Sequence, residues 1–184
     1  MNWQDKIGQV WNIDCLEGMK ELPDKSIDMI LCDLPYGTTA CKWDTIIPFE
    51  PLWRQYKRII KDNGAIVLTA SQPFTSALVM SNSDMFRYEL LWEKSRPTGI
   101  AQARYQVMKK HENILVFYKS KPTFNPIKEI KQYMGKDNLA KPWASWNTGN
   151  NHGLKKTEKK ICAEKRNPTS VLYFPSIDPH KILH

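Results

Sequence analysis

Blocks of apolar residues alternate along the chain with amphipathic stretches, and the two patterns predict strands followed by helices. Residues 27–33 form an apolar run that ends in Asp33, which is typical of a strand covered on both faces in a parallel sheet. Residues 51–61 place Leu, Trp, Tyr and Ile on one face and Arg and Lys on the other, so they predict an amphipathic helix. Residues 65–70 predict a second buried strand, and a helix is expected to begin near Pro73.

Shorter segments complete a repeating order of strands and helices. A helix is predicted at 15–22, and further strands are predicted at 10–14, 87–93, 112–119 and 170–174. The alternation predicts an α/β fold on a parallel sheet with right-handed crossovers. Ligands of such sheets gather beyond the carboxyl ends of the strands, where this sequence places Asp33 and Ser71.

Length and composition predict one globular domain without disulfides or metal. The 184 residues are 41% hydrophobic, which suffices for a single core. The four cysteines form no Cys-x-x-Cys pair, and the four histidines show no ligand spacing with them. A disulfide framework and a structural metal are therefore not expected, and a reducing cytoplasm is the expected compartment. No apolar run reaches the roughly 18 residues of a membrane span, so none is expected.

The positive charge is concentrated in one part of the chain. The net charge is +8, and residues 119–166 hold eleven Lys and one Arg against four acidic residues, with Phe, Tyr and Trp interleaved. This composition is typical of a surface that neutralises phosphates and stacks on bases, although a solvated loop region would have it too. We expect 1–120 to form the main α/β part, 121–167 a loop-rich insertion and 168–184 a return to the sheet.

The turn Asp33-Leu34-Pro35-Tyr36-Gly37 combines groups that suit a planar substrate with an amino group. The Asp33 carboxylate is an acceptor, and Pro35 has no N–H, so the turn carries one donor fewer and its carbonyls are free to accept. Tyr36 offers a flat ring, and Gly37 lets the backbone approach a ligand closely. Two acceptors beside an aromatic ring match the two N–H hydrogens of an exocyclic amine on a heterocycle.

These residues resemble a known family. Asp-Leu-Pro-Tyr (33–36) is similar to the Asp-Pro-Pro-Tyr motif of amino-group DNA methyltransferases, which use S-adenosylmethionine. Residues 12–37 resemble the block around that motif, and later family blocks are matched in order by "CKWD", "KDNGAIVL", "WEKSRPTG", "KHENILVFYKSKPTFNP" and "RNPTSV". The match looks closest to the permuted group of mostly adenine-N6 enzymes, in which the catalytic half precedes the cofactor half. Many of these come from phages and restriction–modification systems, which implies a bacterial or phage-encoded cytoplasmic enzyme.

The resemblance implies a Rossmann-like S-adenosylmethionine-dependent sheet that is incomplete in this chain, with 121–167 as a target-recognition insertion. It implies that Asp33 and the Pro35 carbonyl hold the N6 amine of an adenine flipped out of double-stranded DNA, and that the base stacks on Tyr36. No covalent intermediate with the enzyme is needed, because the amine itself attacks the sulfonium methyl.

Further residues acquire expected roles by the same resemblance. Asp14 and Cys15 match positions near the adenosine end of the cofactor, and Asp33 lies near its methionine end. An equally good interpretation makes Asp14 the cap of the following helix. The residues expected to contact DNA are Leu34, Gly37, Trp43, Arg96 and Arg104. Core packing is the alternative for Trp43, and Asp44 beside it is a further candidate for contact with the base.

The chain also departs from the family pattern. The Phe-x-Gly-x-Gly turn that binds the cofactor is not matched, since no two of the eight glycines have Gly-x-Gly spacing. His184 resembles the first residue of the block that precedes that turn in the permuted group. We therefore expect a fragment of a longer enzyme or one part of a split one, completed by a C-terminal half or a second chain, with strand 27–32 left as an exposed edge. A homodimer also stays open.

Three other functions remain open at this point. Cytosine-N4 methylation uses the same amine geometry, but Asp at the first motif position favours adenine. A non-catalytic DNA-binding remnant would keep the basic surface without the cofactor half. Methylation of a protein glutamine uses an Asn-led motif, which Asp33 does not match.

Overall fold

A computed structural model describes residues 4, 7–130 and 165–174. The chain divides into a larger unit, residues 1–124 with 170–184, and a smaller unit, residues 125–169. The elements of the larger unit are α1 (Cys15–Lys20), β1 (Ile27–Asp33), α2 (Phe49–Ile59), β2 (Ile60–Ala70), α3 (Phe74–Ser81), β3 (Phe86–Thr98), η2 (Ile100–Gln102), β4 (Lys109–Phe117) and β7 (Val171–Phe174). In the smaller unit β5 (Glu129–Ile130) pairs with β6 (Lys165–Arg166). Most of the predicted recognition insertion lies outside the described residues.

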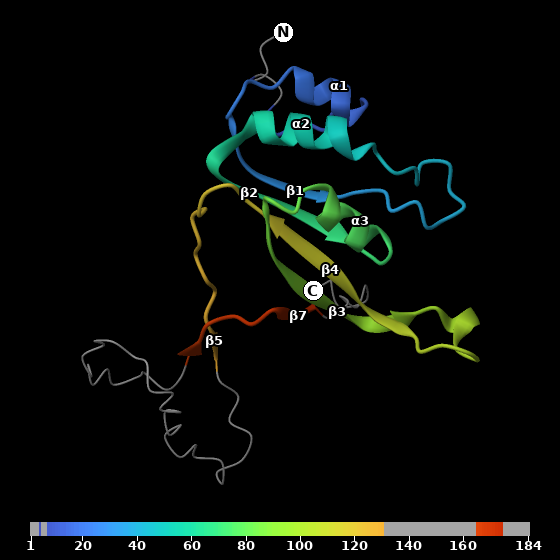
Figure 1. Cartoon of the computed structure of the whole chain (residues 1–184). Coiled ribbons are helices and arrows are strands. Elements are labelled where there is room, and N and C mark those ends of the chain that lie inside the picture. Colours follow the sequence, from blue (N-terminus) through green and yellow to red (C-terminus); the bar gives the residue numbers. More distant parts are fainter. Residues whose placement is uncertain (1–3, 5–6, 131–164, 175–184) are drawn as a thin grey trace, which may run out of the picture. The chain divides into compact units, whose positions relative to one another are not determined.

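The larger unit holds a five-stranded sheet in the order β1-β2-β4-β3-β7, which confirms an α/β fold (Figure 1). Strand β1 runs parallel to β2, and β3 runs parallel to β7. The expectation of an all-parallel sheet was wrong, because β4 lies antiparallel to both β2 and β3. The short connection between β3 and β4 explains this, since it forms a hairpin, whereas a parallel crossover needs about a dozen or more residues.

The core lies between the sheet and the helices. Leu52, Leu68 and Phe117 are fully buried, from α2, β2 and β4 respectively. The Trp53 ring packs against Phe117 with ring centroids 4.9 Å apart, and its indole N–H donates to the Ser81 hydroxyl of α3 at 2.7 Å. The amphipathic pattern of residues 51–61 is thereby confirmed as a core-facing helix.

Helix α1 is fastened to α2 by Arg58. The Arg58 guanidinium donates to the carbonyl oxygens of Met19 and Leu22, at 2.6 and 2.7 Å, at the end of α1. The Met19 carbonyl also accepts the N–H of Leu22 at 3.1 Å, and carbonyls at a helix end are commonly satisfied by groups from outside the helix. Arg58 thus fixes the position of α1, and with it the residues at the start of that helix.

Two predictions about the first strands have opposite outcomes. Residues 10–14 form no strand, and the Val10 side chain is 99% exposed. Among the described strands, β1 ends the sheet, and residues 10–14 pair neither with it nor with any other described strand. The same order confirms the expected exposed edge at β1, where Leu31 is 70% exposed. None of the described helices is long and apolar enough to cross a membrane.

Candidate active site

The site begins where two parallel strands end side by side. Asp33 at the end of β1 is in register with Thr69 near the end of β2. The Tyr36 hydroxyl donates to Oδ1 of Asp33 at 2.7 Å and lies 2.9 Å from the Thr69 hydroxyl. The Thr69 hydroxyl also donates to Oδ1 of Asp33. The hydroxyls of Tyr36 and Thr69 therefore converge on one carboxylate oxygen of Asp33.

This arrangement orients the Asp33 carboxylate and leaves acceptors available. Hydrogen bonds to Asp33 from the described side chains all reach Oδ1, so Oδ2 is available to a ligand. No group among the described residues donates to the Pro35 carbonyl oxygen. Burial raises the pKa of Tyr36, and the neighbouring Asp33 carboxylate raises it further. The phenol therefore stays protonated at neutral pH and acts as a donor toward Asp33.

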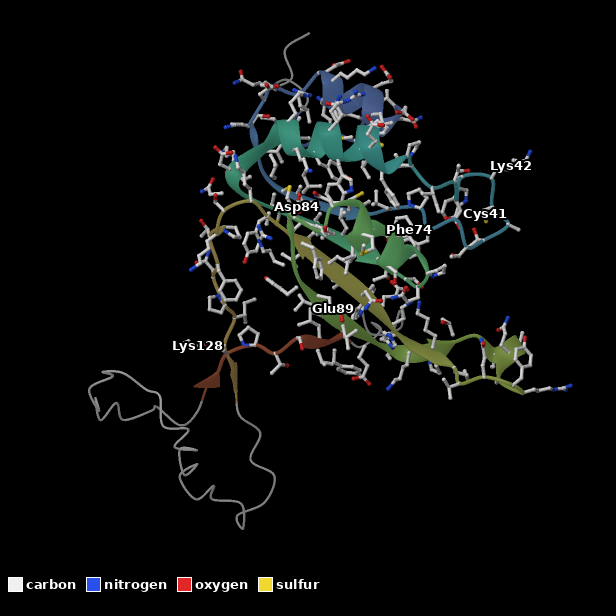
Figure 2. All side chains as sticks on the ribbon, in the orientation of Figure 1. Cys41, Lys42, Phe74, Asp84, Glu89 and Lys128 are labelled. Carbon is white, nitrogen blue, oxygen red and sulfur yellow. The ribbon has the colours of Figure 1, made fainter. Side chains whose placement is uncertain are left out.

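The Tyr36 ring rests on α3. Its centroid lies 5.4 Å from that of Phe74, with an angle of 29° between the planes, and Phe74 in turn lies 5.7 Å from Phe49. Figure 2 shows Phe74 on α3. Phe74 thus packs against one face of the Tyr36 ring, and Tyr36 as a whole is half-buried.

The loop after the turn is held by Asp44. Its carboxylate accepts the backbone N–H groups of Gly37 at 2.8 Å, Thr38 at 2.9 Å and Thr39 at 2.7 Å. Hydrogen bonding by Thr39, followed by that from the Gly37 N–H, lowers the pKa of Asp44 to about 2. Only 8% of Asp44 is exposed. Asp44 thus anchors the loop through its carboxylate, a role that the sequence did not reveal.

Gly37 is required by the geometry of this turn. Its φ is +67°, a conformation that L side chains rarely adopt, and an added Cβ would lie 2.9 Å from Cγ1 of Ile46. The side chain of Leu34, by contrast, belongs to the core and is 5% exposed. A DNA contact at Leu34 would have to be made by its backbone.

The expected cofactor residues lie at the start of α1. Oδ1 of Asp14 accepts the N–H groups of Leu16 at 2.8 Å and Glu17 at 3.3 Å, which confirms the helix-cap interpretation. Burial raises the pKa of Cys15, with smaller contributions from Asp14 and Cys32. A cofactor role for Asp14 and Cys15 stays a prediction.

The expected DNA-contacting residues lie at the surface. Trp43 is 73% exposed, so its alternative assignment to the core was wrong. It lies on the loop whose tip carries Cys41 and Lys42 in Figure 2. Arg96 belongs to β3 and Arg104 follows η2, and both are exposed. Their contact with DNA stays a prediction.

Thr69 and Phe74 are the site residues that the sequence did not single out. Thr69 ends a predicted strand, but only the register of β1 with β2 brings it to Asp33. The sequence places Phe74 near the start of a predicted helix, but it does not indicate that its ring packs against Tyr36. Among the described residues, no group of three or more His, Cys, Asp and Glu is placed to hold a metal ion.

Comparisons with known proteins identify a family of DNA methylases. The N6_N4_Mtase family model, described as DNA methylase, matches residues 27–182. Type II methyltransferase M.HinfI of Haemophilus influenzae is 25% identical over 202 residues, covering 94% of this chain and 55% of the relative. Type II methyltransferase M1.MboII of Moraxella bovis is 25% identical over 133 residues, covering 65% of this chain and 50% of the relative. The chain spans about half the length of these curated relatives.

Solved structures share the fold. The M1.HpyAVI complex with SAM matches with a TM-score of 0.50 at 22% identity, covering 67% of this chain and 62% of the other. The cytosine-N4-specific PvuII DNA methyltransferase matches with a TM-score of 0.51 at 12% identity, covering 90% of this chain and 56% of the other. Because the family model covers most of the chain, including the Asp33 turn, this chain belongs to the N6_N4_Mtase family of DNA methylases.

Proposed function

We propose that this chain carries the catalytic turn of a DNA adenine-N6 methyltransferase that uses S-adenosylmethionine. The observation that carries the proposal is the Asp33 carboxylate, which Tyr36 and Thr69 hold through Oδ1 at the carboxyl edge of the sheet. Oδ2 of Asp33 and the carbonyl of Pro35 then accept the two hydrogens of a flipped adenine amine. Family membership supports this assignment.

The two acceptors work on the nitrogen lone pair. In free adenine the lone pair of N6 is delocalised into the ring, so the amine is a weak nucleophile. Hydrogen bonds from both N–H groups to Asp33 and Pro35 favour a pyramidal nitrogen with its lone pair exposed. Preorganised polar groups of this kind are typically worth about 10²–10³ in rate each.

Base flipping is needed because the amine cannot be reached inside a duplex. Flipping costs a few kcal/mol of stacking and pairing. Stacking on the face of Tyr36 that Phe74 does not cover would offset part of this cost, and the contact with Phe74 orients that ring. Tyr36 thus has two roles, as a donor to Asp33 through its hydroxyl and as a stacking surface through its ring.

The cofactor site is supplied only in part by residues of this chain. Asp14, Cys15 and Asp33 would contact S-adenosylmethionine, which when bound supplies an electrophilic methyl group on sulfur. The 184 residues hold no Gly-x-Gly turn, so we expect weak binding of the cofactor. Tight one-to-one binding of S-adenosylmethionine in isothermal titration would contradict that expectation.

We further propose double-stranded DNA as the partner and residues 121–167 as the target-recognition segment. Two curated relatives are named Type II methyltransferases, which supports a role in restriction–modification in a bacterial or phage-infected cell. Cytosine-N4 methylation is the competing activity, because the same two acceptors fit either amine. Asp33 at the first motif position favours adenine.

The test compares substitutions of Asp33 and Asp28, two aspartates of strand β1. Wild-type protein, Asp33→Ala and Asp28→Ala are incubated in excess over duplex DNA with saturating S-adenosylmethionine, and the nucleosides are analysed by mass spectrometry. Asp28 lies near the opposite end of β1 and pairs with Lys61 at the surface, so it is a matched control. We expect N6-methyladenine from the wild type and from Asp28→Ala, with a loss of about 10²-fold or more in Asp33→Ala. DNA binding without methylation in all three proteins, even in a complex that supplies the cofactor half, would instead indicate a non-catalytic remnant.

A further inference from the structure

The connection between β3 and β4 extends beyond the edge of the sheet that carries Asp33. Asp33 is in register with Thr69 in β2. Ala70, which follows Thr69, is in register with Asn113 in β4. The β3–β4 ladder continues past this level to the pair Thr98–Lys109. In Figure 1 the hairpin projects past the sheet on the same side as the loop that follows β1. We call residues 95–110 the prong.

The prong is basic and contains no acidic residue. Between Ser95 and Lys110 the chain has two Arg and two Lys and no Asp or Glu. Lys110 pairs with Glu93 at 2.7 Å, and Lys109 donates to the Ser71 hydroxyl. These two lysines fix the base of the prong, whereas the exposed Arg96 and Arg104 present their charge to solvent.

The tip of the prong exposes large apolar side chains. Ile100 is 81% exposed, Tyr105 is 76% exposed and Val107 is 92% exposed. Such side chains are normally buried, and a cluster of them on one projection indicates a binding surface. The surrounding positive charge complements a phosphate backbone and disfavours a basic partner such as a second copy of this chain, whose net charge is +8.

The tip is also held in one conformation. Gly99, with φ of +88°, directs the chain into η2. The N–H groups of Gln102, Ala103 and Tyr105 then donate to backbone carbonyls three residues earlier, at 3.1, 3.2 and 3.0 Å. The apolar side chains are thus presented by an ordered turn, which reduces the entropy lost on binding.

We propose that the prong is a DNA wedge. Arg96 and Arg104 bind phosphates, and the apolar tip inserts into the base stack beside the flipped target and fills the space that the base leaves. Apolar side chains inserted between base steps in this way unstack and open a duplex. The inference rests on the proposed function, because it assumes that the edge carrying Asp33 faces DNA.

Binding to duplexes that differ only in one base tests the wedge without knowledge of the recognition sequence. Fluorescence anisotropy measures affinity for a matched duplex and for the same duplex with one abasic site. Insertion is easier where a base is missing, so we expect wild type to prefer the abasic duplex by about 10-fold. The double variant Ile100→Ser/Val107→Ser should lose this preference and keep its affinity for the matched duplex to within a few-fold.

The arginines are tested by salt dependence. Arg96→Gln and Arg104→Gln should each weaken binding to both duplexes equally and reduce the slope of log K against log salt by about 0.9. Arg87→Gln is the matched control, since Arg87 is an exposed arginine near the other end of β3. Thermal melting of every variant checks that the fold is retained.

The outcomes separate the wedge from the proposed function. If wild type binds DNA but the prong variants behave like Arg87→Gln, the wedge is wrong while the proposed function stands. The wedge is also wrong if Ile100→Ser/Val107→Ser converts an oligomer to a monomer and leaves the abasic preference unchanged. Absence of DNA binding by wild type would overturn both. Asp33→Ala should keep the abasic preference, because Asp33 is not part of the prong.

Discussion

Tyr36→Phe separates the two roles assigned to Tyr36. The change removes the hydroxyl that lies 2.7 Å from Asp33 and keeps the ring that stacks on Phe74. A net hydrogen bond is worth about 1 kcal/mol, so we expect the free energy of unfolding to fall by about that amount. For a chain of this size, the melting temperature should fall by roughly 2–4 °C.

Tyr36→Ala removes the hydroxyl and the ring together. Truncation of a fully buried aromatic side chain costs about 3–5 kcal/mol. Because Tyr36 is half-buried, we expect about 2–3 kcal/mol for this variant. The difference between the two variants measures the stacking on Phe74 apart from the hydrogen bond to Asp33.

Urea denaturation at neutral pH provides the measurement, with Tyr88→Phe as the control. Tyr88 is 42% exposed on β3, so loss of its hydroxyl should change stability by less than about 0.5 kcal/mol. Equal losses in Tyr36→Phe and Tyr36→Ala would refute a contribution from stacking. A Tyr36→Phe variant as stable as wild type would refute the hydrogen bond to Asp33.

Three further predictions follow from the loop and the core. Gly37→Ala should lower the free energy of unfolding by at least about 1 kcal/mol, measured in urea, because its φ is +67° and an added Cβ would meet Ile46; unchanged stability would contradict the turn geometry. The pKa of Asp44 is lowered from 3.8 to about 2, so its contribution is complete above 3.8 and is lost as the pH falls toward 2. The difference in melting temperature between wild type and Asp44→Asn should therefore be constant near neutral pH and shrink below about pH 4; a difference that grows in acid would show that the sign is wrong. Phe117→Ala should cost about 3–5 kcal/mol in urea, because Phe117 is fully buried against Trp53; a cost below 1 kcal/mol would contradict that packing.

Local patterns were sufficient to predict much of the fold. The apolar run that ends in Asp33 was found at its predicted place, whereas the amphipathic helix ends at Ile59 and the next strand begins at Ile60, five residues before its predicted start. In each case burial of one stripe or one run of side chains decides the local structure. The groups of the Asp33 turn could be named from the sequence as well, because its acceptors and ring lie within five residues, and their chemistry stays a prediction.

Pairings between distant segments could not be predicted in the same way. The sequence of residues 87–93 predicts a strand. Its antiparallel pairing with β4 depends on a hairpin, which the alternation of apolar and polar residues along a strand does not specify. Residues 10–14 also read as a strand, yet the described sheet gives them no neighbour. Thr69 reaches Asp33 only through the register of two strands, and the three backbone N–H groups that bind Asp44 depend on the path of the loop.

The most direct test of the account is to identify which nucleoside, if any, is methylated in DNA incubated with this chain. Under single-turnover conditions with saturating S-adenosylmethionine and duplex DNA, mass spectrometry should detect N6-methyladenine with wild type and with Asp28→Ala. Asp33→Ala should lose the product by about 10²-fold or more. N4-methylcytosine as the only product would contradict the adenine assignment, and methylation that persists in Asp33→Ala would contradict the role given to the Asp33 carboxylate.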